Sequence, residues 1–238
     1  MKVTEYRVFA DLKRDYNFVF VSDLHGYDNE PIFKAINNLN PEAILVGGDF
    51  IHDRNNYKSG LEFLISVCEK YPVFCSLGNH EFRFDDDMLP LIKETGANIL
   101  DNESVLYEGI NIGGLTSAVK RGAQKDKKAN KRVPDIEFLM NFSNKEGFKL
   151  LLCHHPEYYS KYIKDIDVDL TLSGHAHGGQ WRILGQGIFA PGQGIFPKYT
   201  SGLIDGRLIV SRGLGNPHRI PRINNKPEII NLIITKKP

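Results

Sequence analysis

Two histidines lie one residue apart in the stretch LSGHAHGGQ (172–180), as His175 and His177. Imidazole binds transition metals well, so this pair could hold a metal ion. The pattern alone is weak evidence, because alternate residues in a strand merely point the same way. Whether the two rings do chemistry therefore depends on which other ligand-type side chains the fold brings to them.

Polar residues of the same kind follow four other apolar runs. They are Asp23 and His25 after FVFVS, Asp49 after AILVGG, Asn79 and His80 after VFCSLG, and His154 and His155 after KLLLC. Taken singly, each has an ordinary structural interpretation as a turn residue, a helix cap or a satisfied buried histidine. Five runs that all end in this way favour chemistry, and the side chains offered are imidazole, carboxylate and amide oxygen, which suit transition metals.

The first half of the chain alternates between strand and helix patterns. Strands are predicted at 17–23, 42–49 and 72–80, and helices at 30–40, 60–71 and 87–96. This alternation predicts parallel strands with helices on both faces of the sheet. Because the carboxyl ends of parallel strands meet at one crevice, the polar residues that follow them should be neighbours.

The second half is richer in strands. The runs 147–156 and 168–177 predict two more buried strands, 98–115 predicts short strands with turns, and 206–215 with 227–235 predicts a late β-hairpin. We therefore expect one α/β domain over residues 1–238, whose sheet gains antiparallel strands toward the C-terminus. The sequence has no long Pro/Gly/Ser linker and no repeat of fixed period.

The composition limits the classes of partner. A formal net charge of +1 over 238 residues argues against extensive binding to nucleic acid backbones. The sequence contains neither a secretory apolar region nor an apolar run of about 20 residues. We therefore expect a cytoplasmic protein without a membrane span. A surface patch that docks on a membrane would escape this test. Cys68, Cys75 and Cys153 are odd in number and lie in apolar surroundings, which favours reduced thiols.

One segment departs from the rest. Residues 119–135, and 120–132 above all, are rich in lysine and arginine and nearly free of apolar anchors. The favoured interpretation is a solvated loop, and the alternative is a cationic lid over an anionic substrate. Trp181 could line a substrate groove or pack, and the arginines 212, 219 and 222 could bind phosphate or solvate a surface loop, the latter being slightly favoured.

In chain order, the motifs Asp-x-His-Gly, Gly-Gly-Asp, Gly-Asn-His-Glu, His-x-Pro and Gly-His-x-His resemble those of the calcineurin-like metallophosphoesterase superfamily. They span residues 23 to 177. Further along, GHAHGGQWR, KYTSGL, VSRGLG and KPEIINLII are similar to the bacterial branch that includes the YaeI and YkuE phosphodiesterases. The resemblance implies a β-sandwich of mixed sheets flanked by helices, with the active site at the C-terminal ends of the strands.

The resemblance also implies a set of site residues. Asp23, His25 and His177 would hold one metal, Asn79, His154 and His175 a second, Asp49 would bridge the two, and His80 would be the catalytic histidine. His154 is favoured over His155 because the family pattern His-x-Pro places the ligand first. The two divalent ions would be manganese or iron, with zinc or cobalt as alternatives. The branch often has an acidic residue three places after the bridging aspartate, where this chain has His52 followed by Asp53.

The implied activity is hydrolysis of phosphoesters, with phosphodiesters favoured. A hydroxide shared by the two metals would attack phosphorus, and His80 would protonate the leaving group or stabilise charge on the phosphoryl oxygen. The expected substrate is a small phosphoester or a lipid-like phosphodiester. Two alternatives are a non-catalytic scaffold of the same fold and a nuclease, and the oligomeric state is not indicated.

Overall fold

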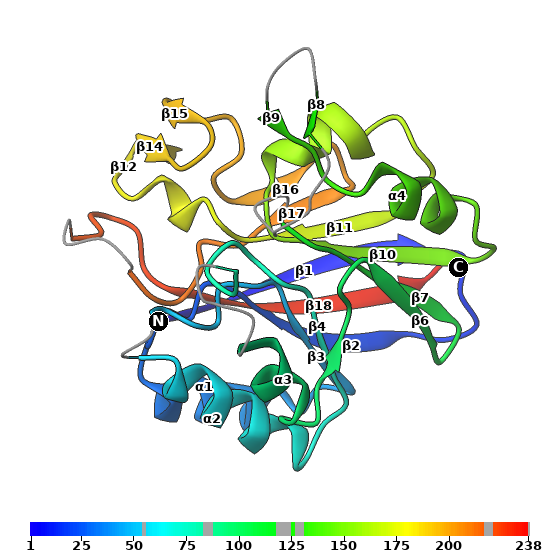
Figure 1. Cartoon of the computed structure of the whole chain (residues 1–238), viewed down its shortest axis with the longest axis horizontal. Coiled ribbons are helices and arrows are strands. Elements are labelled where there is room, and N and C mark those ends of the chain that lie inside the picture. The colour runs from blue at the N-terminus through cyan, green and yellow to red at the C-terminus, as the bar shows by residue number, and fades with distance from the viewer. Residues whose placement is uncertain (54–55, 83–87, 118–124, 127–130, 217–220, 238) are drawn as a thin grey trace.

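Two six-stranded β-sheets stack face to face, with helices on their outer sides (Figure 1). The structure is a computed structural model that describes residues 1–53, 56–82, 88–117, 125–126, 131–216 and 221–237. The two sheets and the covering helices form four layers. This arrangement confirms the sandwich of mixed sheets that the resemblance implied.

The first sheet contains the strands at both ends of the chain. Its spatial order is β1 (Lys2–Ala10), β18 (Glu228–Lys236), β2 (Tyr16–Val21), β3 (Ala43–Val46), β4 (Val73–Cys75) and β5 (Asn98–Ile99). Strands β2 to β5 run parallel, whereas β18 is antiparallel to β2 and parallel to β1. The parallel part carries three of the five apolar runs that end in ligand-type residues.

The second sheet supplies the other two runs. Its order is β16 (Gly202–Ile204), β17 (Leu208–Val210), β11 (Leu170–Ser173), β10 (Phe148–Cys153), β7 (Ile110–Leu115) and β6 (Glu103–Tyr107). The four inner strands are parallel and the two edge strands are antiparallel to their neighbours.

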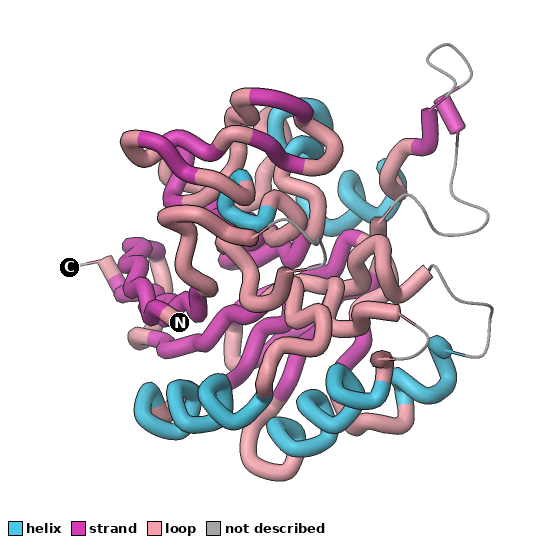
Figure 2. The backbone as a smooth tube through the Cα atoms, turned by 90° about the vertical axis from the view of Figure 1, so that its left-hand side faces the viewer, coloured by secondary structure: helices cyan, strands magenta, loops and turns pink. Residues whose placement is uncertain are grey.

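Helices cover only the outer face of each sheet. Helices α1 (Asn29–Leu39), α2 (Lys58–Cys68) and α3 (Met88–Lys93) pack on the first sheet and lie along the bottom of Figure 2, and α4 (Ile136–Ser143) with the π-helical turn η1 (Tyr159–Ile163) packs on the second. The side chains of Asp28 and Asp135 cap α1 and α4 by accepting hydrogen bonds from backbone N–H groups of the first turn. Among the described residues, none of the helices is both long and apolar enough to cross a membrane.

The remaining elements are short. They are β8 (Lys125–Asp126), β9 (Lys131–Arg132), the 3₁₀ turn η2 (His177–Gly179), β12 (Arg182–Ile183), β13 (Gln186–Gly187), β14 (Phe189–Ala190) and β15 (Gly194–Ile195). The last four form two hairpins that follow η2 directly in the chain. Most of the predicted lysine-rich loop, 120–132, lies outside the described residues.

Alternate side chains of β2 pack into two different hydrophobic cores. Phe18 and Phe20 point between the sheets, where they join Leu150 and Leu152 of β10 in one fully buried cluster. Val19 and Val21 point the other way, under the helices. Because both faces of β2 are buried, its sequence is a continuous apolar run.

Two sequence predictions are wrong. The strands do not form one sheet with helices on both faces, because the second face of each sheet is covered by the other sheet. Residues 206–215 and 227–235 do not pair as a hairpin either, since β17 lies beside β11 and β16 whereas β18 lies between β1 and β2. Apolar alternation shows that a segment is a strand but carries no information about its partner.

Candidate metal centre

The ligand-type residues meet where strands of both sheets end. Asp23 and His25 follow β2, Asp49 follows β3, and Asn79 with His80 follows β4, all in the first sheet. His154 directly follows β10, and His175 with His177 follows β11, in the second. A backbone contact joins the two sets, because the His175 N–H donates to Asp23 Oδ1 at 3.0 Å. The site thus lies at the carboxyl ends of strands from two sheets, whereas the strand pattern of the sequence had suggested the edge of a single sheet.

One cluster consists of Asp23, His25 and His177. A ligand atom from each lies within 4.8 Å of the others, and all three residues are buried. His177 Nε2 is 3.5 Å and His25 Nε2 is 4.0 Å from Asp23 Oδ1. These are the three residues predicted to hold the first metal.

A second cluster consists of Asp49, His154 and His175, again with ligand atoms within 4.8 Å of one another. Asp49 Oδ2 lies 3.2 Å from His154 Nε2 and 3.6 Å from His25 Nε2, so this oxygen stands between the two clusters. The loop that carries Asn79 lies beside this cluster, because the backbone N–H of the next residue, His80, donates to Asp49 Oδ1 at 2.8 Å.

The buried polar atoms of this site suit a cation. Within the part of the chain that the structure describes, neither ring nitrogen of His25 has a hydrogen-bond partner, and Asn79 Oδ1 is buried without one. A buried polar group left without a partner costs about 1–3 kcal/mol. A divalent cation would satisfy the lone pairs on these atoms, so the donor set fits metal binding.

Burial keeps three imidazoles in their ligand form. It lowers the pKa of His25 to about 3, and it holds the pKa values of His175 and His177 well below the ordinary range. A neutral imidazole offers a lone pair, as metal binding requires.

His154 and Asp49 form a charged pair in the metal-free protein. Burial by itself would lower the pKa of His154, but the carboxylates of Asp49 and Asp23 outweigh burial and raise this pKa to about 10. Burial likewise opposes the ionised form of Asp49, but His154 and His25 hold the pKa of Asp49 well below its usual range. For Asp23, burial dominates and raises the pKa to about 6. The proton on His154 thus balances the negative charge of these carboxylates, as a bound cation would otherwise do.

His80 is oriented by two contacts. Its backbone N–H donates to Asp49 Oδ1, and its Nδ1 lies 2.6 Å from the carbonyl oxygen of His52. A carbonyl only accepts, so Nδ1 carries the hydrogen, and Nε2 is the nitrogen directed at the centre, 3.9 Å from Asp49 Oδ2. The unusual residue at position 52 therefore supports His80 through its backbone, and its ring also lies in a group with those of His25 and His80.

The backbone of the site is strained. Positive φ angles between 44° and 63° occur at Asp23, His25, Asp49, His175 and His177. Non-glycine residues pay for this left-handed conformation, and such strain gathers at functional sites. Two glycines allow the loops to close together: a Cβ on Gly48 would lie 2.5 Å from the backbone nitrogen of Gly78, and one on Gly174 would lie 2.3 Å from Asp23 Oδ2.

Sequence reasoning assigned no role to Glu81, which supports the site from behind. Its carboxylate accepts hydrogen bonds from the backbone N–H groups of Asp49 (3.0 Å), Ile51 (3.2 Å) and Gly78 (2.8 Å). Burial, and then the nearby Asp49, raises its pKa to about 7. The signal was present, because Glu81 is the last residue of the Gly-Asn-His-Glu motif.

Sequence reasoning also assigns no role to His155. Its Nε2 lies 2.6 Å from Ser117 Oγ and its Nδ1 lies 3.3 Å from Glu157 Oε1, while its ring centroid is 4.2 Å from that of His175. His155 and its two partners thus pack beside His175. It is His154, and not His155, that lies next to Asp49. The histidine favoured from the family pattern is thus the one that the fold turns toward both clusters.

Arg222 does not solvate a surface loop, which is the interpretation that the sequence favours. Its guanidinium donates to the carbonyl oxygens of Arg212, Gly213 and Gly215, and it lies 3.3 Å from His177 Nδ1. Burial lowers its pKa to about 10. Arg222 therefore braces the loops around His177, while position 219 lies outside the described residues.

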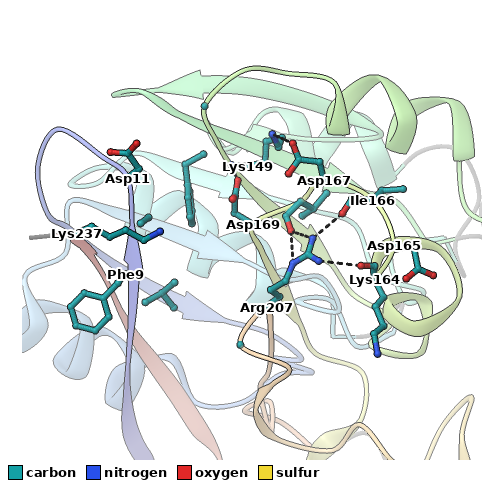
Figure 3. Close-up of a pocket in the computed structure, with 16 residues that line it drawn as sticks. Phe9, Asp11, Lys149, Lys164, Asp165, Ile166, Asp167, Asp169, Arg207 and Lys237 are labelled. Carbon is teal, nitrogen blue, oxygen red and sulfur yellow. Dashed lines mark hydrogen bonds and ion pairs between the residues drawn. The ribbon is translucent and has the colours of Figure 1, made fainter.

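A separate hollow lies at the opposite ends of the strands. It has a volume of about 730 Å³ and is lined by the start of β10, the residues just before β11 and the end of β1. Figure 3 shows the Arg207 guanidinium turned toward the carbonyl oxygens of residues 164, 166 and 168, and Lys149 paired with Asp167. Since these charged groups are engaged with the protein itself, the hollow adds no ligand-type residue to the metal centre.

Comparison with known proteins identifies the family. The family model described as calcineurin-like phosphoesterase matches residues 16–179, which contain the five motifs that run from Asp23 to His177. The chain belongs to this family, whose members are metallophosphoesterases that use divalent metals.

Three curated relatives illustrate the similarity. An uncharacterised metallophosphoesterase of Campylobacter jejuni is 31% identical over 71% of this chain and 46% of its own length, and one of Helicobacter pylori is 27% identical over 75% and 49%. The chain thus spans about half the length of these two relatives. Phosphodiesterase YaeI of Escherichia coli is 26% identical over 94% of this chain and 84% of its own.

Proposed function

We propose that this calcineurin-like phosphoesterase hydrolyses phosphoester bonds, with phosphodiesters favoured, at a centre of two divalent cations. The proposed ligands are Asp23, His25 and His177 for one cation, Asn79, His154 and His175 for the other, and Asp49 shared between them. The observation that carries the proposal is the position of Asp49 Oδ2 between two clusters of buried, ligand-type side chains from both sheets.

The donor set indicates which cations would be held. It consists of imidazole nitrogens, carboxylate oxygens and one amide oxygen, with no thiolate among them. Such sites take manganese or iron, which we favour, and also zinc or cobalt. When bound, the two cations would supply an activated water near neutral pH and would neutralise charge on the phosphoryl group.

In this proposal His80 acts on the substrate rather than on the cations. Its Nδ1–H is committed to the His52 carbonyl, so when the ring is an imidazolium the proton that it can transfer is the one on Nε2, on the side of the centre. From there it protonates the leaving oxygen as the ester bond breaks. General acids of this kind contribute about 10²–10⁴-fold to the rate.

The proposed substrates are small or lipid-like phosphoesters. The near-neutral net charge gives no support to a nucleic acid substrate. We further propose a cytoplasmic location, supported by the three free cysteines, of which Cys75 and Cys153 are buried.

The experiment is hydrolysis of bis-p-nitrophenyl phosphate and of p-nitrophenyl phosphate before and after chelation, with single metals added back. We expect activity that chelation removes and that manganese or iron restores, with the diester preferred. Full metal occupancy without turnover of either ester, or of an alkyl phosphodiester, would contradict the proposal and favour a scaffold role. Activity that is unaffected by thorough chelation would contradict the metal centre itself.

A further inference from the structure

Two short hairpins beside the metal centre expose an unusual amount of apolar surface. We call the side chains of Trp181, Ile183, Leu184, Phe189, Ile195 and Phe196 the apolar hairpin patch; all six are exposed, Leu184 completely and Ile195 to 72%. These six lie within 16 consecutive residues. Single exposed apolar residues are common on proteins, but a gathered set of this kind marks an interaction surface.

The patch lies on two projecting hairpins rather than on a flat sheet face. In Figure 1 the strands β12, β14 and β15 stand off from the second sheet at the upper left of the molecule, and in Figure 2 these hairpins lie at the top. Leu184 and Gly185 form the two-residue turn between β12 and β13, with φ angles of 48° and 85°. Such turns favour Asn, Asp or Gly, so a leucine there contributes nothing to the turn and points its whole side chain into solvent.

The hairpins are attached to the metal centre. Trp181 follows His177 by four residues, and the backbone N–H of Ile188 donates to the carbonyl oxygens of Gly179 (3.0 Å) and Trp181 (2.9 Å). Asn225 holds the other side of this loop by donating to the His177 carbonyl at 2.7 Å. A partner that covers the patch would therefore lie close to the loop that carries the proposed ligand His177.

Charge indicates the kind of partner. Residues 170–227 contain a single acidic residue, Asp205, against seven lysines and arginines, of which Lys198 and Lys226 are exposed. Lys198 is exposed immediately after the patch. Projecting apolar side chains next to an exposed lysine, without an acidic residue in the hairpins, complement a surface that is anionic outside and apolar beneath.

We propose that the apolar hairpin patch inserts into the interfacial region of an anionic lipid bilayer. Leu184, Ile195 and Phe196 enter the boundary between head groups and acyl chains, and Trp181 lies at head-group level, as tryptophan does at membrane interfaces. This docking goes beyond the proposed function, since it requires no catalysis. It would also bring head-group phosphoesters to the side of the molecule that holds the metal centre.

The test uses vesicles and the single tryptophan of the chain. Trp181 is the only tryptophan, so its fluorescence reports the patch directly. With phosphatidylglycerol vesicles we expect the full chain to co-sediment and its emission to shift to shorter wavelength, with a weaker response to phosphatidylcholine vesicles and weakening at high salt. No substrate is present, so the result is independent of hydrolase activity.

A matched pair of double variants locates the binding surface. Leu184→Ser with Phe196→Ser should weaken vesicle binding by about tenfold or more, because two inserted apolar side chains are lost. Leu106→Ser with Phe9→Ser removes a similarly exposed leucine and phenylalanine from β6 and β1 and should bind as the unmodified chain does. Unfolding midpoints of both variants check that the fold is kept.

Three results would overturn the proposal. One is an unmodified chain that neither sediments with anionic vesicles nor changes its emission. Another is equal binding by the two double variants. The third is a concentration-dependent dimer that Leu184→Ser with Phe196→Ser dissolves while vesicles remain unbound, which would assign the patch to a second copy of the chain.

Discussion

The two oxygens of the Asp49 carboxylate have different neighbours. Oδ1 accepts the backbone N–H of His80, whereas Oδ2 faces His154 and His25 across the junction of the two clusters. One residue thus fixes the histidine proposed to act on substrate and joins the residues proposed to hold metal. The left-handed backbone of Asp49 adds a local cost, which is consistent with selection for position rather than for stability.

Replacing His80 with alanine tests its role separately from metal binding. We expect unchanged metal content and a loss of about 10²–10⁴-fold in kcat, because a positioned proton donor is removed. The loss should be smaller for a p-nitrophenyl ester than for an alkyl ester, since p-nitrophenolate leaves without protonation. Metal analysis and steady-state kinetics on both esters make the comparison. Undiminished turnover of the alkyl ester by a clean preparation would show that His80 has no such role.

The titration of His154 predicts how the metal-free protein responds to pH. Its pKa of about 10 exceeds the ordinary 6.5, so the folded state binds this proton more tightly than the unfolded state does. The associated stability is complete below about pH 6.5 and is lost as pH rises through about 10. The pKa of Glu81 is likewise raised, from 4.5 to about 7, so its contribution to stability is also lost as pH rises, between these two values.

We therefore expect the unfolding free energy of the chelated protein to fall between about pH 7 and pH 10. The metal-loaded protein should fall less, because a cation takes the place of the proton. Urea unfolding at several pH values, with and without metal, measures both slopes. A chelated protein that gains stability over this range would contradict the assigned charge state of His154.

At the level of elements, the loops after β3 and β4 are joined by a buried carboxylate. Glu81 receives three backbone N–H groups, one from each of Asp49, Ile51 and Gly78, so it ties the loop that carries Asp49 to the loop that carries Asn79 and His80. This contact explains how two short strand ends hold several polar side chains in fixed positions. It also explains why a buried glutamate follows the histidine in the motif.

Glu81→Ala should destabilise the chelated protein by about 1–3 kcal/mol, since it leaves buried N–H groups without an acceptor. It should also weaken metal binding, because Asp49 loses its support. The matched control is Glu103→Ala, which removes an exposed glutamate from β6 and should change stability by less than about 0.5 kcal/mol. Denaturant unfolding compares the two variants, and equal effects would show that Glu81 does not hold these loops.

At the level of the whole molecule, the apolar runs indicated most of the strands but not the two sheets. The runs that end in Asp23, Asp49, Asn79 and His154 are buried on both faces, which predicts a strand but leaves open whether helices or another sheet cover it. Strand β1 was not anticipated, because its exposed positions mix polar residues with Val3 and Phe9 and its partner β18 lies more than 200 residues away. The roles of Glu81 and His155 depend on contacts across loops, which spacing alone does not reveal.

Because the proposed ligands come from both sheets, metal should bind only when the two are stacked. We propose that residues 1–238 form one domain, so chelation should lower the stability of a single unfolding transition. Binding to the folded state alone stabilises by about 2.7 kcal/mol at a free metal concentration of 100 times Kd. Thermal unfolding over a series of metal concentrations tests this, and a midpoint that does not move would contradict binding across the sheets.

Metal stoichiometry of purified protein tests the central claim most directly, using one variant in each sheet. The unmodified chain, loaded with manganese or iron and freed of excess metal, should contain two equivalents by elemental analysis. Asp49→Ala, after β3, should lose both, and His154→Ala, after β10, should lose at least one. Two tightly held equivalents in either variant, or none in a folded unmodified chain, would contradict a metal centre built from both sheets.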